Sequence, residues 1–263
     1  MISIPLIKWP VYKLGQNDFI KGKTVQYLKI KETIVEQIDS GLLPARQKLP
    51  SERKLAEAFS TTRVTMRAAL SSLEAEARLY REDRRGWFVC PEPLRYDPSS
   101  TFNFMSMANN QGRAGFSKLI EARKVLATKQ AAALLQVPML TDIYHIKRVR
   151  FLEDRPVVYV SNFIKAAHFP DLLDHDFTPS LTDVYLKYYA VRYQTTHYRV
   201  STTCLFGEIA QVLRATPGSP AMLVERINYD QNGLLIDCDL EYWRHDAICI
   251  ESTAQLNAES TLG

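Results

Sequence analysis

The chain has 263 residues, of which 46% are hydrophobic and 24% are charged, and this composition is typical of a folded globular protein. No apolar run reaches the roughly 18 residues of a membrane-spanning helix, and residues 1–9 do not resemble a signal peptide. We therefore expect a cytoplasmic protein with no membrane partner. The net charge of +4 is uneven: basic residues are in excess up to residue 90 and acidic residues beyond it. This asymmetry weakly favours a nucleic-acid-binding module in the N-terminal third.

Three predicted helices follow an N-terminal extension, residues 1–23. Apolar residues recur at helical spacing over residues 24–40. Ser51 is a favourable N-cap for a second helix over 52–59. A short polar interruption precedes a third helix over roughly 63–77. Two short helices separated by three or four polar residues have the spacing of a helix-turn-helix.

A small hairpin is predicted directly after the third helix. Strand-like runs at 78–81 and 86–90 are separated by the charged turn 82–85. Together with the helices, this hairpin completes a winged helix-turn-helix, to which we assign residues 24–90. Prolines and small polar residues then predict a linker over 91–100, because they resist a continuing strand or helix.

Arginines are concentrated where a winged helix meets DNA. Arginine can bind guanine or a phosphate, threonine can contact a thymine methyl group, and glycine allows close approach of a wing tip. The candidate DNA-binding residues are Arg53, Arg63, Thr65, Arg67, Arg84, Arg85 and Gly86. Any one of these arginines is as readily explained as an exposed surface residue. The order of helix, turn, arginine-bearing helix and basic hairpin favours DNA binding for the set.

A second predicted domain covers residues 101–252, followed by a C-terminal tail, 253–263. Its predicted strands form two hairpins, 143–152 with 157–164 and 221–229 with 234–242. The second hairpin turns at an Asn-Gly pair, one of the better hairpin signals, and a helix is predicted before it over 206–215. The fold class is therefore α+β with a mainly antiparallel sheet.

Cysteine spacing argues against a metal centre. Cys90, Cys204, Cys238 and Cys249 are far apart and form no CxxC pair. Scattered cysteines in a chain of this size are more often buried thiols than zinc ligands or a disulfide framework. We expect neither a metal ion nor another cofactor.

The first domain resembles the DNA-binding domain of the GntR superfamily. Residues 48–56, KLPSERKLA, are similar to its LPSER-x-LA signature, and residues 62–70, TRVTMRAAL, to its SR-x-TVR-x-AL recognition helix. The resemblance implies that operator DNA is contacted by Arg53, Arg63, Thr65, Arg67 and Gly86. Two departures stand out: Ala45-Arg46 replaces the usual Pro-Gly, and Trp87 replaces a small wing residue. Neither removes a DNA ligand, but Trp87 is expected to change how the wing meets the groove.

The second domain resembles the UTRA effector-binding domain of the HutC subfamily, which has a chorismate-lyase-like fold. The similar segments are 146–150, 155–157, 180–182 and 228–246. The resemblance implies that an effector's anionic group is held by Arg148, Arg150 and Ser180, with Asn103 as a looser candidate. Asp237 stands where many relatives carry a Glu that binds polar groups of the effector.

The two arginines also suit this role on physical grounds. Alternate residues of a strand face the same side, so Arg148 and Arg150 can reach one pocket. Paired guanidinium groups suit a phosphate, a phosphonate or a carboxylate. The alternative is two arginines on an exposed sheet face.

A narrower similarity suggests an effector. Residues 83–89 and 229–246 are similar to the subfamily's regulators of 2-aminoethylphosphonate use. A carboxylate at Asp237 opposite Arg148 and Arg150 suits a zwitterion, so 2-aminoethylphosphonate or a close metabolite is the sharpest hypothesis. A sugar phosphate or a histidine catabolite is the alternative.

These features predict a transcriptional regulator that binds palindromic operator DNA as a homodimer. Repression is the expected direction of regulation, with activation as the alternative. A lyase-like enzyme is the alternative, but the sequence has no G-x-S-x-G, phosphate-binding glycine loop or H-E-x-x-H motif, and its five histidines are dispersed. A purely architectural DNA binder would leave the second domain without a role. We therefore expect a regulator and not an enzyme.

Overall fold

The computed structural model describes residues 21–99, 103–177 and 180–253. The chain divides into two compact units with the boundary between Glu92 and Pro93. Among the described helices, none is both long enough and apolar enough to cross a membrane.

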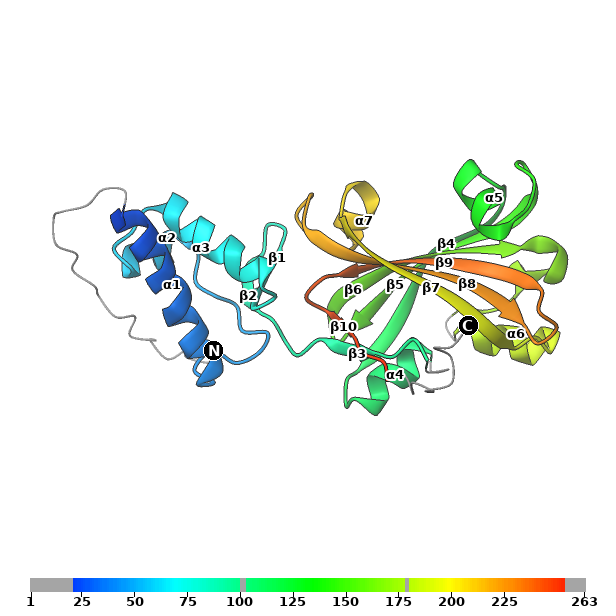
Figure 1. Cartoon of the computed structure of the whole chain (residues 1–263), viewed down its shortest axis with the longest axis horizontal. Coiled ribbons are helices and arrows are strands. Elements are labelled where there is room, and N and C mark those ends of the chain that lie inside the picture. The colour runs from blue at the N-terminus through cyan, green and yellow to red at the C-terminus, as the bar shows by residue number, and fades with distance from the viewer. Residues whose placement is uncertain (1–20, 100–102, 178–179, 254–263) are drawn as a thin grey trace, which may run out of the picture. The chain divides into compact units, whose positions relative to one another are not determined.

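The N-terminal unit consists of three helices and a hairpin, as predicted (Figure 1). Its elements are α1 (Lys21–Asp39), α2 (Glu52–Ala58), α3 (Arg63–Ala75), β1 (Leu79–Glu82) and β2 (Gly86–Val89). Side-chain oxygens cap two of the helices: Ser51 accepts from the amide of Lys54 at 3.4 Å, and Thr62 from that of Thr65 at 3.1 Å. These caps satisfy amides that have no partner within the first turn of a helix. The first helix begins at Lys21, inside the segment predicted as an extension.

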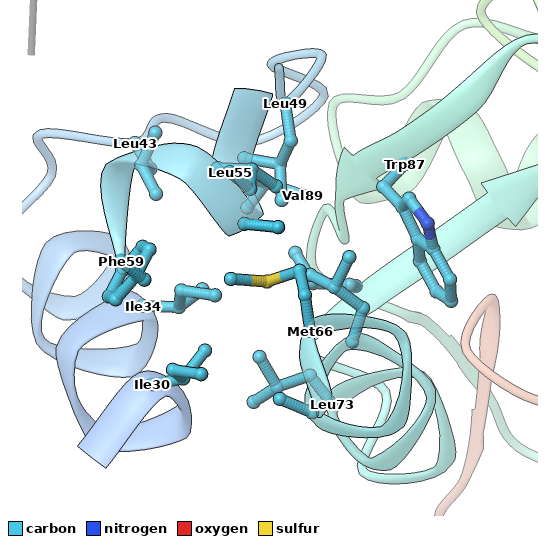
Figure 2. Close-up of a cluster of buried hydrophobic side chains, with 14 residues drawn as sticks. Ile30, Ile34, Leu43, Leu49, Leu55, Phe59, Met66, Leu73, Trp87 and Val89 are labelled. Atoms are coloured by element: carbon cyan, nitrogen blue, oxygen red, sulfur yellow. The ribbon is translucent and has the colours of Figure 1, made fainter. Parts of the chain in front are cut away.

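One apolar cluster holds this unit together (Figure 2). Helix α1 contributes Ile30 and Ile34, and α3 contributes Met66, Leu70 and Leu73, all of them fully buried. Burial of large aliphatic side chains stabilises a fold by about 1.5–3 kcal/mol each. The cluster therefore fixes α3 against α1 and leaves the opposite face of α3 exposed.

The C-terminal unit is built on a six-stranded antiparallel sheet with the order β4-β5-β6-β9-β8-β7. Its strands are β4 (Gly115–Leu126), β5 (Asp142–Leu152), β6 (Arg155–Lys165), β7 (Tyr193–Cys204), β8 (Pro220–Asp230) and β9 (Leu235–Arg244). The two predicted hairpins are β5–β6 and β8–β9. The structure brings β6 and β9 together at the centre of the sheet.

Helices cover both faces of this sheet (Figure 1). They are α4 (Phe104–Asn110), α5 (Lys129–Leu135), α6 (Leu181–Tyr189) and α7 (Gly207–Val212), with 3-10 turns at Ala166–His168 and Leu172–Asp174. Helices α4 and α6 lie on one face, and α5 and α7 lie on the other. Even and odd residues of each strand therefore face different layers.

The predicted linker contains a short strand. β3 (Leu94–Tyr96) pairs in parallel with β10 (Ile248–Ile250). Leu94 is fully buried, and the Tyr96 ring packs edge-on against Trp243, 6.2 Å between centroids. Prolines flank β3 without interrupting it, so the chain enters the C-terminal unit as a packed strand rather than as a free linker.

A buried ion cluster anchors the last strands of this unit. The carboxylate of Asp246, fully buried, pairs with Arg155 and lies 3.5 Å from Nε of Arg244. Although burial alone would raise the pKa of Asp246, the two arginine charges lower it to about 2. A depressed carboxyl pKa stabilises the folded state above the unfolded pKa of about 4, and this stabilisation is lost as the pH falls through about 2.

Asp246→Asn is expected to lower the unfolding free energy of this unit by about 3–5 kcal/mol at pH 7, because it leaves buried arginine charge uncompensated. The difference from wild type should shrink between about pH 4 and pH 2, where wild type loses the same interaction. Denaturant unfolding of both proteins across this pH range measures the effect. A difference that does not change with pH would contradict the assignment.

Candidate functional site

A basic groove separates the recognition helix α3 from the wing in the N-terminal unit. Its lining is dominated by positively charged side chains, namely Lys48, Arg53, Arg63, Arg67, Arg81, Arg84 and Arg85. Six of the seven predicted DNA-binding residues, including Gly86, line it. Such a concentration of charge beside an exposed helix face suits the phosphate backbone of a duplex.

The first two residues of α3 present their side chains to solvent. Arg63 and its neighbour Val64 are exposed, Val64 by 81%. Thr65, the remaining predicted DNA contact, does not line the groove; its hydroxyl lies 2.9 Å from that of Thr62. Thr65 thus takes part in the cap of α3, a role that its sequence position alone does not reveal.

The wing tip carries two arginines with different partners. Arg84 is 94% exposed and lies 3.7 Å from the carboxylate of Asp83. Arg85 pairs with the buried carboxylate of Glu82 in β1. Gly86 adopts a φ of +100°, a conformation that side chains rarely tolerate, so the turn requires glycine here.

A cavity of about 320 Å³ lies in the C-terminal unit, on the sheet face that carries α4 and α6. The predicted effector residues Asn103, Arg148, Arg150 and Ser180 all line it. Asn103 caps α4 and Ser180 caps α6, and the Asn103 amide lies 3.4 Å from the Ser180 hydroxyl. The two caps therefore meet at the cavity wall, opposite the arginines of β5.

Arg148 is the most deeply buried cation of this cavity, at 3% exposed. One nitrogen donates to the Asn162 amide oxygen at 3.1 Å, while Nε has no hydrogen-bond partner among the described residues. Burial and the nearby charge of Arg150 lower the pKa of Arg148 to about 10. The group remains a cation at neutral pH and is under-coordinated.

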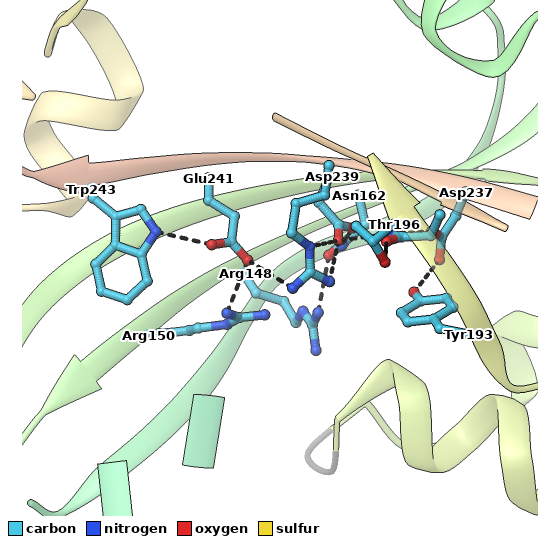
Figure 3. Close-up of polar contacts among 11 residues, drawn as sticks. Arg148, Arg150, Asn162, Tyr193, Thr196, Asp237, Asp239, Glu241 and Trp243 are labelled. Carbon is cyan, nitrogen blue, oxygen red and sulfur yellow. Dashed lines mark hydrogen bonds and ion pairs between the residues drawn. The ribbon is translucent and has the colours of Figure 1, made fainter. Parts of the chain in front are cut away.

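Two further arginines of the cavity are paired with carboxylates of β9 (Figure 3). Arg150 lies 3.2 Å from Glu241, and Arg226 of β8 lies 2.6 Å from Asp239 and 3.9 Å from Glu241. Trp243 donates to the other oxygen of Glu241 at 2.9 Å. Asp239 and Glu241 are thus already engaged inside the protein.

Asp237 lies apart from the cavity lining. Its carboxylate is fully buried and accepts from the hydroxyl of Tyr193 at 2.5 Å and from Asn228 at 2.6 Å. Burial and the charge of Asp239 raise the pKa of Asp237 well above that of an ordinary Asp. The β9 carboxylate that does line the cavity is Asp239.

Several residues that line the cavity and the groove were not predicted from the sequence. They are Tyr96, Asn162, Tyr193, Thr196, Arg226 and Asp239 in the cavity, and Lys48, Glu52 and Arg81 in the groove. Strand alternation places Arg226 and Asp239 on one face only after the β8–β9 register is known, since they are direct cross-strand partners. Over the described parts of the chain, no group of three or more His, Cys, Asp or Glu residues is arranged to hold a metal ion.

Two family models match the chain, one over each unit. The model of bacterial regulatory proteins of the gntR family matches residues 26–89, and the UTRA domain model matches residues 110–248. The chain is 32% identical to the uncharacterized HTH-type transcriptional regulator YihL of Escherichia coli, covering 83% of this chain and 93% of the relative. It is 30% identical to the HTH-type transcriptional repressor NagR of Bacillus subtilis, covering 84% of this chain and 90% of that protein.

The fold is also that of a solved structure. The crystal structure of PhnF from Mycobacterium smegmatis aligns with a TM-score of 0.60 and 21% identity, over 87% of this chain and 100% of that one. From the two matched models and these relatives, the chain belongs to the GntR family of bacterial regulatory proteins and carries its effector-sensing module as a UTRA domain; it is a DNA-binding transcriptional regulator, not an enzyme.

Proposed function

We propose that this regulator is a cytoplasmic, homodimeric repressor whose affinity for a palindromic operator is controlled by a small anionic or zwitterionic effector. The buried, under-coordinated guanidinium of Arg148 is the observation that carries the proposal. An isolated buried charge is costly, and an anion in the cavity would remove that cost.

The groove between α3 and the wing is the proposed operator-binding surface. Arg63 at the start of α3 has no ion-pair partner among the described residues, so its guanidinium is available to a guanine edge. Val64 beside it offers an apolar contact to a thymine methyl group. Arg84, exposed at the wing tip, suits the neighbouring minor groove. Two such surfaces in a dimer would bind half-sites about one helical turn apart.

The cavity supports an effector of limited size with one strongly anionic group. Arg148 and Arg150 offer two guanidinium groups, and the Ser180 hydroxyl lies at the N-terminus of α6, where the helix dipole favours negative charge. Asp239, rather than the predicted Asp237, is the β9 carboxylate in the cavity lining, and Arg226 already engages it. We retain 2-aminoethylphosphonate as one candidate, beside sugar phosphates and histidine catabolites such as urocanate.

The cavity is physically connected to the entry strand of its unit. Tyr96 of β3 lines the cavity, and β3 begins only two residues after the unit boundary. We propose that effector binding rearranges β3 and the residues around Ser180. This rearrangement changes the spacing of the two DNA-binding units in the dimer. Coupling of this kind is typically worth about 1–3 kcal/mol.

Arg63→Ala is expected to weaken binding to operator DNA by about 1–3 kcal/mol, because a base contact is lost. Binding to random DNA should weaken much less. The probe is a duplex that the wild-type protein selects from randomised DNA, titrated at fixed salt. Arg78→Ala removes an equal charge outside the groove and should leave the ratio of the two affinities unchanged. Equal losses on both DNAs would instead make Arg63 a phosphate contact.

Arg148→Met is expected to abolish the rise in melting temperature that an anionic effector produces, because it removes the cation and keeps a side chain of similar length. The ligand-free variant should be at least as stable as wild type, since no buried charge loses its partner. A thermal-shift screen with 2-aminoethylphosphonate, phosphonoacetate, sugar phosphates and urocanate measures both. Lys147→Met is the matched control, because Lys147 faces the opposite side of β5 toward Glu208. Ligand-induced stabilisation that survives in Arg148→Met would refute the anion site.

A further inference from the structure

One carboxylate lies in the groove that is proposed to bind DNA. Glu52 is the single acidic residue among the described side chains that line it, and its side chain is only 13% exposed. A negative charge here repels DNA phosphates and lowers affinity for any duplex. Electrostatics alone therefore disfavours this residue, and its contacts indicate what it contributes instead.

Glu52 joins three elements of the N-terminal unit. It begins α2, and its Oε2 accepts from Nε and Nη2 of Arg67 on α3, at 3.0 and 2.8 Å. Its Oε1 accepts from Nε1 of Trp87 in wing strand β2, at 3.1 Å. One carboxylate thus holds the recognition helix and the wing in a fixed relation.

The surroundings of Glu52 keep this bridge charged and ordered. Burial acts to raise the pKa of Glu52, but hydrogen bonds from Arg67 and Trp87 and the charges of Arg67 and Arg81 outweigh burial and lower that pKa. Trp87 is 3% exposed, so its ring is fixed by packing, and the Arg81 guanidinium lies 5.6 Å from the ring centroid. The indole N–H has a fixed direction and finds its acceptor in Glu52.

We propose that Glu52 is a positioning residue for operator recognition, which locks Arg67 of the recognition helix to Trp87 of the wing so that both elements meet DNA preorganised. The proposal rests on the proposed DNA-binding surface and deepens it. Preorganisation reduces the side-chain and loop ordering that binding would otherwise require. Specific binding benefits, whereas binding to random DNA gains little because no fixed geometry is needed there.

The test is Glu52→Gln in the full-length protein. Removal of a negative charge predicts tighter binding to every duplex if electrostatics dominates. Positioning predicts the opposite sign on the operator: about a 10-fold loss for the duplex selected by the wild-type protein, with affinity for random DNA unchanged or higher. Trp87→Phe, which keeps an aromatic ring but lacks the N–H donor, is expected to lose operator affinity in the same direction.

Controls separate positioning from simple destabilisation. Glu57→Gln removes the same charge from α2, where Glu57 pairs with exposed Arg53, and should change both affinities alike. In an Arg67→Ala background, Glu52→Gln should no longer weaken operator binding, since the bridge is already broken. A merely structural effect would lower the melting temperature and reduce both affinities together, leaving their ratio unchanged.

Two results would overturn the inference. If Glu52→Gln tightens or leaves unchanged operator binding while Arg63→Ala weakens it, the DNA-binding surface stands and the positioning role is wrong. If Arg63→Ala also has no effect on the operator, the surface itself is wrong, and the positioning role falls with it.

Discussion

The buried guanidinium of Arg148 is the constraint around which the C-terminal unit is arranged. Asp239 and Glu241 lie two strands away on β9, but Arg226 and Arg150 already engage them. Turning either carboxylate toward Arg148 would leave another shielded cation without its partner. Arg148 is thus left without a carboxylate partner in this network, and this is the basis on which we propose that an anion binds in the cavity. The positive charge that no internal carboxylate neutralises is the proposed binding group for the effector's anion.

The N-terminal unit distributes its charge in a related way. Outside the groove Arg78 pairs with Asp39, whereas the groove gathers seven cations around Glu52, the one carboxylate among its described lining residues. That carboxylate directs a side chain rather than neutralising the surface. In both units, carboxylates hold particular arginine side chains in place. Excess positive charge lines the surface proposed to bind DNA in one unit and the effector in the other.

The sequence predicts well where strong periodicity and specific motifs coincide. The three helices, the wing and the β5–β6 and β8–β9 hairpins follow from apolar spacing and turn residues. The arginine pair of β5 follows from the family resemblance. The edge strands β4 and β7 escaped prediction, because an edge strand needs no buried face along its length and β7 is largely polar and exposed. The strand within the linker and the Asp239 contact depend on long-range pairing, which local patterns do not encode.

Anion binding at Arg148 is expected to be linked to DNA release through β3, whose Tyr96 lines the same cavity. The most direct test is to titrate the selected operator duplex with the protein free and saturated with whichever screened anion stabilises it most. We expect an operator affinity lower by about 5- to 150-fold with the anion bound, and an equal reciprocal loss of anion affinity on DNA. Equal operator affinity in both states would contradict the link between the two units.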